Sequence, residues 1–457
     1  MAQYSARLSM LIVLAIAAAA AAQERPAVIE AAKQADRAGL RVLVQQKANV
    51  NTAEGDGTTA LHWAAYRDDI ESVDLLIRAG ANVNAANDLG ATPLWNAGMN
   101  AGAPVTRRLL DAGANPNLAL LAGETPLMVA SRSGKADVVA LLLAKRADAN
   151  ARASRQQTAL MWAAAERHPE VVKLLVEHGA DVHARSSEWQ EMMAVPPHGL
   201  PQYNKIIPHG GDTALLFAAR SGDLESARLL AGAGANVNDA DAWGVSATTM
   251  AAHAGFTDMV EWLLDHGADA SAAGAGFAAL HAAIMRRDTR MVSALLAHGA
   301  DPNAPLKTWT PTRRSSRDFN FAPELVGATP FWLAARFNEP EVMRLLLKHG
   351  ANAAFVHQGR YHNEEPVEPR TQVTNAVMAA TGMGGGVAWL QPDRAQRETL
   401  MLESVRLAAD QGGVDLNAEN SDGRTALDAA RALKFERVAA FLIERGARAG
   451  TARKSQN

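Results

Sequence analysis

This chain of 457 residues contains no cysteine, which excludes disulfide bonds, thiolate metal sites and cysteine nucleophiles. It also lacks a strong excess of one charge, because its formal net charge is −3. The sequence therefore gives no global electrostatic reason to expect binding to nucleic acid or acidic lipid. Apolar residues make up 48% of the chain, which is enough for a continuous hydrophobic core.

Recognisable catalytic motifs are missing as well. No Gly-x-Ser-x-Gly, His-Glu-x-x-His or paired-carboxylate pattern occurs. The glycine cluster Gly382 to Gly386 lacks the GxxxxGK[ST] pattern and follows a predicted helix, so a flexible loop is expected there. Zinc needs three or four convergent ligands. The spacing of His198, His209, His357 and His362 matches no such pattern. The sequence thus predicts no catalytic residue, no metal site and no cofactor.

The one long apolar run lies at the N-terminus. Arg7 precedes a run of apolar and small residues from Leu8 to Ala22, and Ala20 to Ala22 form a small-residue cleavage site before Gln23. The run is short for a bilayer span, which needs about 20 apolar residues. We predict a secretory signal peptide over residues 1–22 and a periplasmic or secreted mature chain without stable membrane insertion. An uncleaved membrane anchor is the alternative.

A block ending in Gly-Ala-Asn or Gly-Ala-Asp recurs along most of the chain. Five successive alanines of this block lie 33 residues apart, and the same spacing separates Val414 from Ala447. The positions are Ala48, Ala81, Ala114, Ala147 and Ala180, followed after a gap by Ala235, Ala268, Ala300 and Ala351. A constant period of this length is typical of a stacked array of repeats.

One unit, residues 56–88, shows why each repeat folds. Thr59 can cap a first helix, on which Leu61 is apolar. A second apolar helix follows and ends at Gly80, which can adopt the left-handed conformation. No single unit can bury both faces of two short helices, so neighbouring units must stack. Lys47 and Arg146 stand where glycine normally ends the second helix, and the same backbone would cost each about 1 kcal/mol.

The signature Thr-Ala/Pro-Leu-His…Ala-Ala…Leu-Leu…Gly-Ala-Asp/Asn-Val-Asn resembles the ankyrin repeat. The resemblance implies an all-α solenoid of about eleven helix-turn-helix units over residues 23–449, with hairpin-like loops, the fingers, between repeats. Residues 450–457 are expected to be a disordered tail. In this pattern His62 and His281 have structural roles. Trp63, Trp162 and Phe217 recur at one inner-helix position and are predicted to be core.

The period is broken by insertions. Three of them enlarge fingers, near residues 188–210, 307–326 and 357–370, and one lies between paired helices, near residues 382–398. Long loops without secondary structure are often functional. Aromatic residues and arginine dominate binding hot spots. We therefore predict partner contacts at Trp309, Arg313, Arg314, Arg317, Phe319 and Phe321, with Trp189, Tyr203 and Tyr361 contributing. The alternative is that these rings pin the loops to the solenoid.

These features predict an exported, non-catalytic scaffold that binds another protein through its inner-helix face and enlarged fingers. Nucleic acid is not an expected partner. The alternative from a different class is an enzyme or metal-dependent protein with a site between the enlarged fingers. An exported effector acting on a host protein would use the same binding mechanism and differ only in destination.

Overall fold

The computed structural model describes residues 26–193, 204–310, 321–362, 369–386 and 392–451. The chain divides into two compact units. The first comprises the residues up to Ser154 together with Thr158–Ala163 and Glu177–Ala180. The second comprises Arg155–Gln157, Ala164–Val176 and the described residues from Asp181 onward. That residues 23–449 form a single solenoid stays a prediction.

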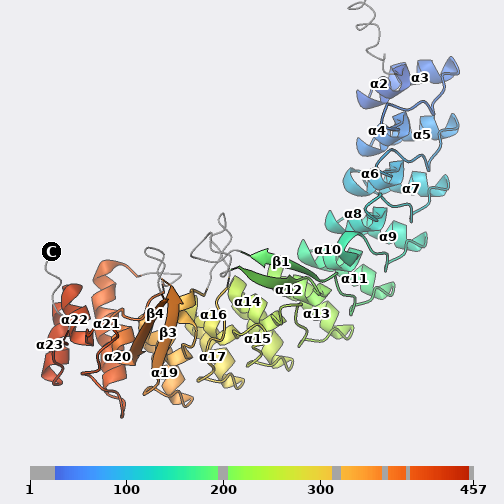
Figure 1. Ribbon diagram of the computed structural model, residues 1–457. Helices are drawn as coiled ribbons and strands as arrows, with labels where there is room; N and C mark the ends of the chain where they lie inside the picture. The colour runs from blue at the N-terminus through green and yellow to red at the C-terminus, as the bar shows by residue number, and fades with distance from the viewer. Residues whose placement is uncertain (1–25, 194–203, 311–320, 363–368, 387–391, 452–457) are drawn as a thin grey trace, which may run out of the picture. The chain divides into compact units, whose positions relative to one another are not determined.

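The first unit is built from pairs of short antiparallel helices (Figure 1). Its pairs are α2 (Ala27–Lys33) and α3 (Arg37–Gln45), α4 (Ala60–Tyr66) and α5 (Ile70–Arg78), α6 (Pro93–Asn100) and α7 (Ala103–Asp111), and α8 (Pro126–Arg132) and α9 (Ala136–Ala144). The 3-10 turn η1 (Ser154–Gln156) precedes a fifth pair, α10 (Ala159–Ala165) and α11 (Pro169–Glu177). The division between the two units runs through this fifth pair.

The second unit continues the pattern and adds short strands. Its helical pairs are α12 (Ala214–Ser221) and α13 (Leu224–Gly232), α14 (Ala247–Ala254) and α15 (Thr257–Asp265), α16 (Ala279–Met285) and α17 (Thr289–Ala297), α18 (Pro330–Arg336) and α19 (Pro340–Lys348), α20 (Ala376–Ala380) and α21 (Arg394–Ala409), and α22 (Ala426–Ala432) and α23 (Glu436–Glu444). Between them lie β1 (Trp189–Met193), β2 (Lys205–His209), η3 (Pro323–Leu325), β3 (Val356–His362) and β4 (Pro369–Asn375).

The described residues thus contain eleven helical pairs, which confirms the predicted repeat fold. Two of the enlarged fingers contain two-stranded antiparallel hairpins, β1–β2 and β3–β4. Two boundaries differ from the prediction. Helix α21 begins at Arg394, inside the interval 382–398 that was predicted to be an insertion between helices. Gly450 donates its amide to Asp428 and Thr451 to Glu419, so the tail is ordered through Thr451.

The helix ends follow local chemistry. Thr92 caps α6 by accepting a hydrogen bond from the Trp95 amide at 3.2 Å, and Pro93 occupies the first helical position, where a missing N–H has no cost. Lys47 and Arg146 adopt φ of 59° and 64°, as the repeat alignment predicts. Each non-glycine residue in this left-handed region costs about 1 kcal/mol.

The core of each repeat lies between its own two helices and those of the neighbouring repeats. Leu61 of α4 and Val73 and Leu76 of α5 are fully buried. Leu75, between them on the same helix, is only partly buried. Such a core is continuous only because consecutive repeats cover one another's apolar faces.

An asparagine ladder joins successive repeats at the ends of their second helices. The Asn84 side-chain amide donates to the Gly113 carbonyl at 3.1 Å, and Asn84 Oδ1 accepts from the Asn115 amide at 2.8 Å. One or both bonds recur with Asn51, Asn117, Asn150, Asn238, Asn303 and Asn417. Where the side-chain amide donates, it pairs with a carbonyl at the end of the next repeat's second helix. The helix itself leaves that carbonyl without a hydrogen bond.

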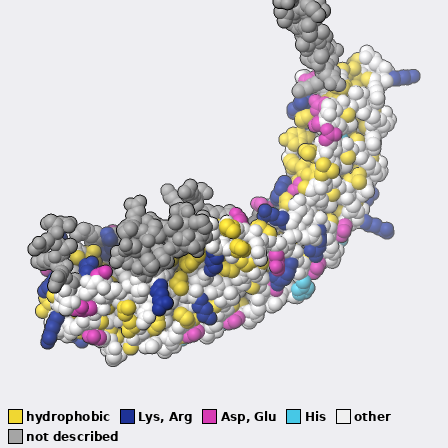
Figure 2. All heavy atoms as spheres, in the orientation of Figure 1, with side chains coloured by type: hydrophobic (Ala, Val, Ile, Leu, Met, Phe, Trp, Pro, Cys, Tyr) yellow, Lys and Arg dark blue, Asp and Glu magenta, His cyan; other side chains and the backbone are white. Residues whose placement is uncertain are grey.

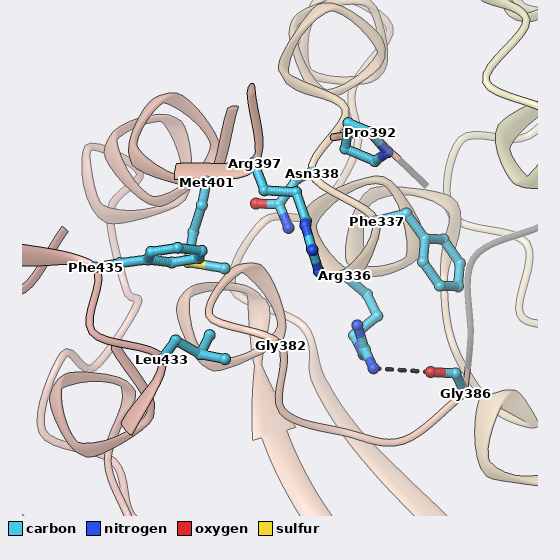
Figure 3. A pocket seen from close by; sticks show the side chains of 10 residues that line it. All are labelled: Arg336, Phe337, Asn338, Gly382, Gly386, Pro392, Arg397, Met401, Leu433 and Phe435. Atoms are coloured by element: carbon cyan, nitrogen blue, oxygen red, sulfur yellow. Dashed lines mark hydrogen bonds between the residues drawn. The ribbon is translucent and has the colours of Figure 1, made fainter. Parts of the chain in front are cut away.

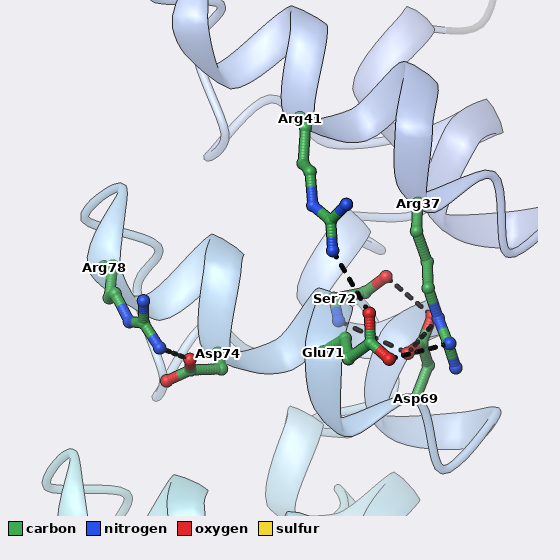
Figure 4. Close-up of polar contacts among 7 residues, drawn as sticks. All are labelled: Arg37, Arg41, Asp69, Glu71, Ser72, Asp74 and Arg78. Atoms are coloured by element: carbon green, nitrogen blue, oxygen red, sulfur yellow. Dashed lines mark hydrogen bonds and ion pairs between the residues drawn. The ribbon is translucent and has the colours of Figure 1, made fainter.

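Charged side chains join the second helices of the first unit (Figure 4). Arg37 of α3 donates to Asp69 at 2.9 Å, and Arg41 donates to Glu71 at 3.2 Å. Burial of Asp69 opposes its ionisation, but hydrogen bonds from Ser72 and Arg37 outweigh that effect and hold the pKa below its ordinary value. Asp69 also accepts from the Ser72 amide, so it caps α5 as well.

Candidate interaction surface on the enlarged fingers

The first enlarged finger is a hairpin seated on the repeat stack of the second unit. β1 and β2 pair antiparallel, with Met192 opposite Ile206 and Glu191 opposite Ile207. Ile207 is buried, whereas Met192 and Ile206 are 65% and 55% exposed. Because side chains alternate along a strand, one face of the hairpin packs on the stack and the other presents an apolar pair to solvent.

Trp189, one of the predicted contact residues, lies at the base of this hairpin. Its ring stacks on His209 with centroids 5.4 Å apart, and the Arg155 guanidinium lies 4.1 Å from its ring centre. Trp189 is partly buried, and these neighbours fix its ring in place. The structure therefore gives Trp189 a role in seating the finger, and the remaining exposed part of the ring is available for a contact.

Lys205 of β2 connects the first enlarged finger to the second. Its Nζ donates to Thr308 Oγ1 at 2.7 Å and lies 5.0 Å from the centre of the Trp309 ring. Burial lowers the pKa of Lys205 from its ordinary value. Trp309, another predicted contact residue, thus lies where two insertions meet, and it is partly exposed.

The second enlarged finger has an anchored base. The Thr310 amide donates to the Phe321 carbonyl at 3.1 Å, and the Phe321 amide donates to Thr310 Oγ1 at 2.8 Å. Phe321 is 1% exposed and packs against Phe277 and His281, with ring centroids 5.3 and 6.3 Å away. A buried ring presents no surface to a partner, so the prediction that Phe321 contacts one is wrong.

Most of the other predicted contact residues fall in parts of the chain outside the described structure. Arg313, Arg314, Arg317 and Phe319 lie outside the described residues, as does Tyr203. The backbone of Tyr361 belongs to β3, but its side chain is not among those described. The structure therefore does not place these six side chains, and their proposed role rests on the sequence.

The third enlarged finger, β3–β4, packs against the second. His357 of β3 is buried and its Nε2 lies 3.0 Å from the Val326 carbonyl. Gly359 runs so close to the Glu324 backbone that a Cβ there would come within 2.9 Å of the Glu324 carbonyl oxygen. The β3–β4 finger also contacts the following repeat, where Ser421 donates to the Thr371 carbonyl of β4. A glycine in β3 is what this close approach requires.

These contacts join the three enlarged fingers into one series, which we call the finger row. It consists of β1–β2, residues 307–310 and 321–326, and β3–β4. Lys205 connects its first two members, and His357 connects its last two. The apolar side chains Met192, Ile206 and Val356 are exposed on it. The three enlarged fingers therefore lie side by side.

Aromatic side chains on the first helices are more exposed than the sequence predicts. Trp63, Trp162 and Phe217 are partly exposed, so the prediction that they are core is wrong. Lys33 lies 4.4 Å from the Trp63 ring centre and Arg132 lies 4.6 Å from that of Trp162. Hydrophobic side chains gather on the side of the first unit formed by α4, α6 and α8 (Figure 2). The position of a residue within the repeat predicts which side of the helix it lies on. It does not predict how much of that side is buried.

The histidines predicted to be structural are confirmed as such. His62 is buried, with Nδ1 3.1 Å from the Thr59 amide and Nε2 2.9 Å from the Ala91 carbonyl of the next repeat. His281 makes the equivalent bonds to Ala278 and Ala304. Burial lowers the pKa of His281 to about 4, so its ring is neutral at physiological pH.

Within the described residues, no three His, Asp or Glu side chains cluster in a way that could hold a metal ion. No helix in those ranges is long and apolar enough to cross a membrane. The fold and the fingers define the class of protein: a repeat protein of stacked antiparallel helical pairs with enlarged loops between repeats.

Comparison with known proteins identifies the family. A family model described as ankyrin repeats (3 copies) matches residues 28–119, 94–186 and 215–305, and an ankyrin repeat model matches residues 326–357. The first model alone covers more than half of the chain, so the chain belongs to the ankyrin-repeat family. Ankyrin repeats generally mediate protein–protein interaction.

A solved structure is similar over part of the chain. The crystal structure of the human ASB11 ankyrin repeat domain is 28% identical, with a TM-score of 0.43. The match covers 52% of this chain and 98% of that one. No curated protein matches the chain.

Proposed function

We propose that the chain is an exported, non-catalytic scaffold that binds a partner protein through the finger row, with the first-helix face as a second contact. The observation that carries this proposal is the link from Lys205 to Thr308 and Trp309, which joins separate insertions into one surface. Insertions without a shared role would not need to contact one another in this way. A preorganised surface also loses little conformational entropy on binding.

The chemistry of the finger row suits a protein partner. Met192 and Ile206 offer an exposed apolar pair, and Trp309 adds a partly exposed ring. Interfaces combine such apolar centres with a charged rim. Arg313, Arg314 and Arg317 would supply that rim, with Phe319, Tyr203 and Tyr361 as further contacts. Trp189 would contribute from the base of the first finger.

Affinity capture with matched variants tests this function. The double variant Met192→Ser with Ile206→Ser removes the apolar pair from the finger row. The control, Val42→Ser with Ile443→Ser, removes two side chains that are 49% and 50% exposed on α3 and α23. We expect the first variant to lose the proteins that the wild type captures and the control to keep them. Equal capture by both variants would place the contact elsewhere.

Export is the second part of the proposal, and it rests on the sequence of residues 1–22. Mass spectrometry of the mature protein should find an N-terminus near Gln23, in a periplasmic or extracellular fraction. Recovery of intact Met1 in a membrane fraction would instead support an uncleaved anchor. No contact among the described residues favours the alternative of an enzyme or metal site between the fingers.

A further inference from the structure

A cavity of about 270 Å³ lies among the last three helical pairs of the second unit (Figure 3). Its walls come from the end of α18, from Gly382, Gly386 and Pro392 between α20 and α21, from helix α21 and from the turn after α22. Phe337, Met401, Leu433 and Phe435 make much of this wall apolar. Ligand sites usually enclose about 300–1,000 Å³, so this cavity has room for one side chain or one small molecule.

Two arginines line the cavity from different elements. Arg336, at the end of α18, donates from Nε to the Gly385 carbonyl at 2.9 Å and from an Nη to the Gly386 carbonyl at 2.8 Å. Arg397 reaches toward Arg336 from α21 (Figure 3). A guanidinium has five N–H donors, so these two bonds leave donors of Arg336 available.

Neither guanidinium forms an ion pair within the part of the chain that the structure describes. Burial lowers the pKa of Arg336 to about 10, although the more distant Glu324 carboxylate partly offsets this effect. Carbonyl oxygens satisfy donors but do not neutralise a positive charge. Two arginines that line one cavity and form no ion pair with a described carboxylate therefore favour an incoming anion.

Asn338 also lines the cavity, but its Oδ1 is buried and so presents no acceptor to a ligand there. The cavity thus combines positive charge with apolar walls.

We propose that this cavity binds a terminal carboxylate carried by an apolar group. The C-terminal residue of a peptide and a free N-acylated amino acid share this chemistry. The carboxylate accepts hydrogen bonds from Arg397 and Arg336. The apolar group contacts Met401 and Phe435. This binding does not depend on the finger row.

Calorimetric titration of the full chain with N-acetyl-L-phenylalanine tests the proposal. We expect saturable binding that weakens at least tenfold for N-acetyl-L-phenylalaninamide, which has no carboxylate. The peptide acetyl-Ala-Ala-Phe with a free C-terminus distinguishes the two sources. If only the peptide binds, the ligand is a protein C-terminus; if only the free acid binds, it is a small molecule. Equal affinity for acid and amide, or binding of neither the free acid nor the peptide, would overturn the proposal.

Matched variants locate the binding. Arg397→Gln should weaken the carboxylate ligand at least tenfold while leaving the melting temperature unchanged, since Arg397 is exposed. The control is Arg406→Gln on the same helix, where the guanidinium lies over Phe441 at 5.3 Å and outside the cavity. Leu433→Glu, at a residue that is 43% exposed, should also weaken binding by repelling the carboxylate. Wild-type affinity in both Arg397→Gln and Leu433→Glu would refute the site.

Discussion

Lys205 and Thr308 are 103 residues apart in the chain, and their side chains are joined by a hydrogen bond of 2.7 Å. The ammonium also lies over the Trp309 ring. One lysine therefore sets the position of the first enlarged finger against the second. Partial burial removes some water from the Lys205 ammonium, which lowers its pKa and strengthens its interaction with the ring.

Replacing this lysine should affect binding more than stability. Lys205→Met keeps the aliphatic length but removes the hydrogen bond and the cation–π contact. We expect the free energy of unfolding to fall by about 1–2 kcal/mol at most, because one hydrogen bond and one partly exposed cation–π pair are lost. Capture of the partner should fall strongly, because the two fingers no longer hold a fixed spacing. Lys307→Met, an exposed neighbour, is the control.

The asparagine ladder predicts a specific stability loss. Asn84→Ala removes two hydrogen bonds, one from its side-chain amide to Gly113 and one to its Oδ1 from Asn115. Each bond contributes about 0.5–1.5 kcal/mol, so unfolding should become easier by about 1–3 kcal/mol. Asn100→Ala, at an exposed helix end, should change stability by less than about 0.5 kcal/mol. Urea unfolding of both variants makes the comparison, and equal losses would contradict it.

Adjacent leucines on α5 provide a matched pair of core substitutions. Leu76 is fully buried, whereas Leu75 is partly exposed. Leu76→Ala should cost about 2–5 kcal/mol, because it leaves a cavity between stacked helices. Leu75→Ala should cost clearly less, since it removes less buried surface. A larger loss for Leu75→Ala, measured by thermal or urea unfolding, would show that the burial of this helix is wrongly assigned.

The repeat architecture could be read from the sequence because it depends on local chemistry. The left-handed residues Lys47 and Arg146 after the second helices are set by their neighbours in the chain, and the structure has them as predicted. Asp393, which caps α21 through the Gln396 amide, is a local signal of the same kind. An N-cap aspartate followed three residues later by Gln396 is a helix-start pattern, and it could have shown that the helix begins inside the predicted insertion.

The enlarged fingers could not be read in the same way, because distant contacts decide them. Phe321 looked like a binding residue from its composition, yet it is buried against Phe277 and His281 of another repeat. The exposure of Trp63 depends on how far Lys33 of the preceding repeat covers its ring. Such facts follow from three-dimensional packing between repeats, on which the period of the sequence carries no information.

A buried carboxyl group at the start of α19 makes stability depend on pH. Glu339 occupies the position before the second helix, where Asp69 and Asp223 cap α5 and α13 through their carboxylates. The longer Glu339 side chain forms no such cap. Both of its carboxyl oxygens are buried and accept no hydrogen bond from the described residues. Burial raises its pKa to about 8, although the positive charge of Arg287 opposes this shift.

The sign of the pH effect follows from the two protonation states. Between about pH 4.5, the ordinary pKa of glutamate, and about pH 8, the folded chain keeps this proton and the unfolded chain releases it. Folding stability should therefore decrease as pH rises through this window, by about 1.4 kcal/mol per pH unit from this group, and change no further above pH 8.

Glu339→Gln removes the titration, so the variant should gain stability relative to wild type as pH rises from 5 to 8. Urea unfolding at several pH values measures this difference, with Glu341→Gln on the exposed side of α19 as the control. A constant difference between Glu339→Gln and wild type across that range would show that Glu339 is ionised in the folded chain.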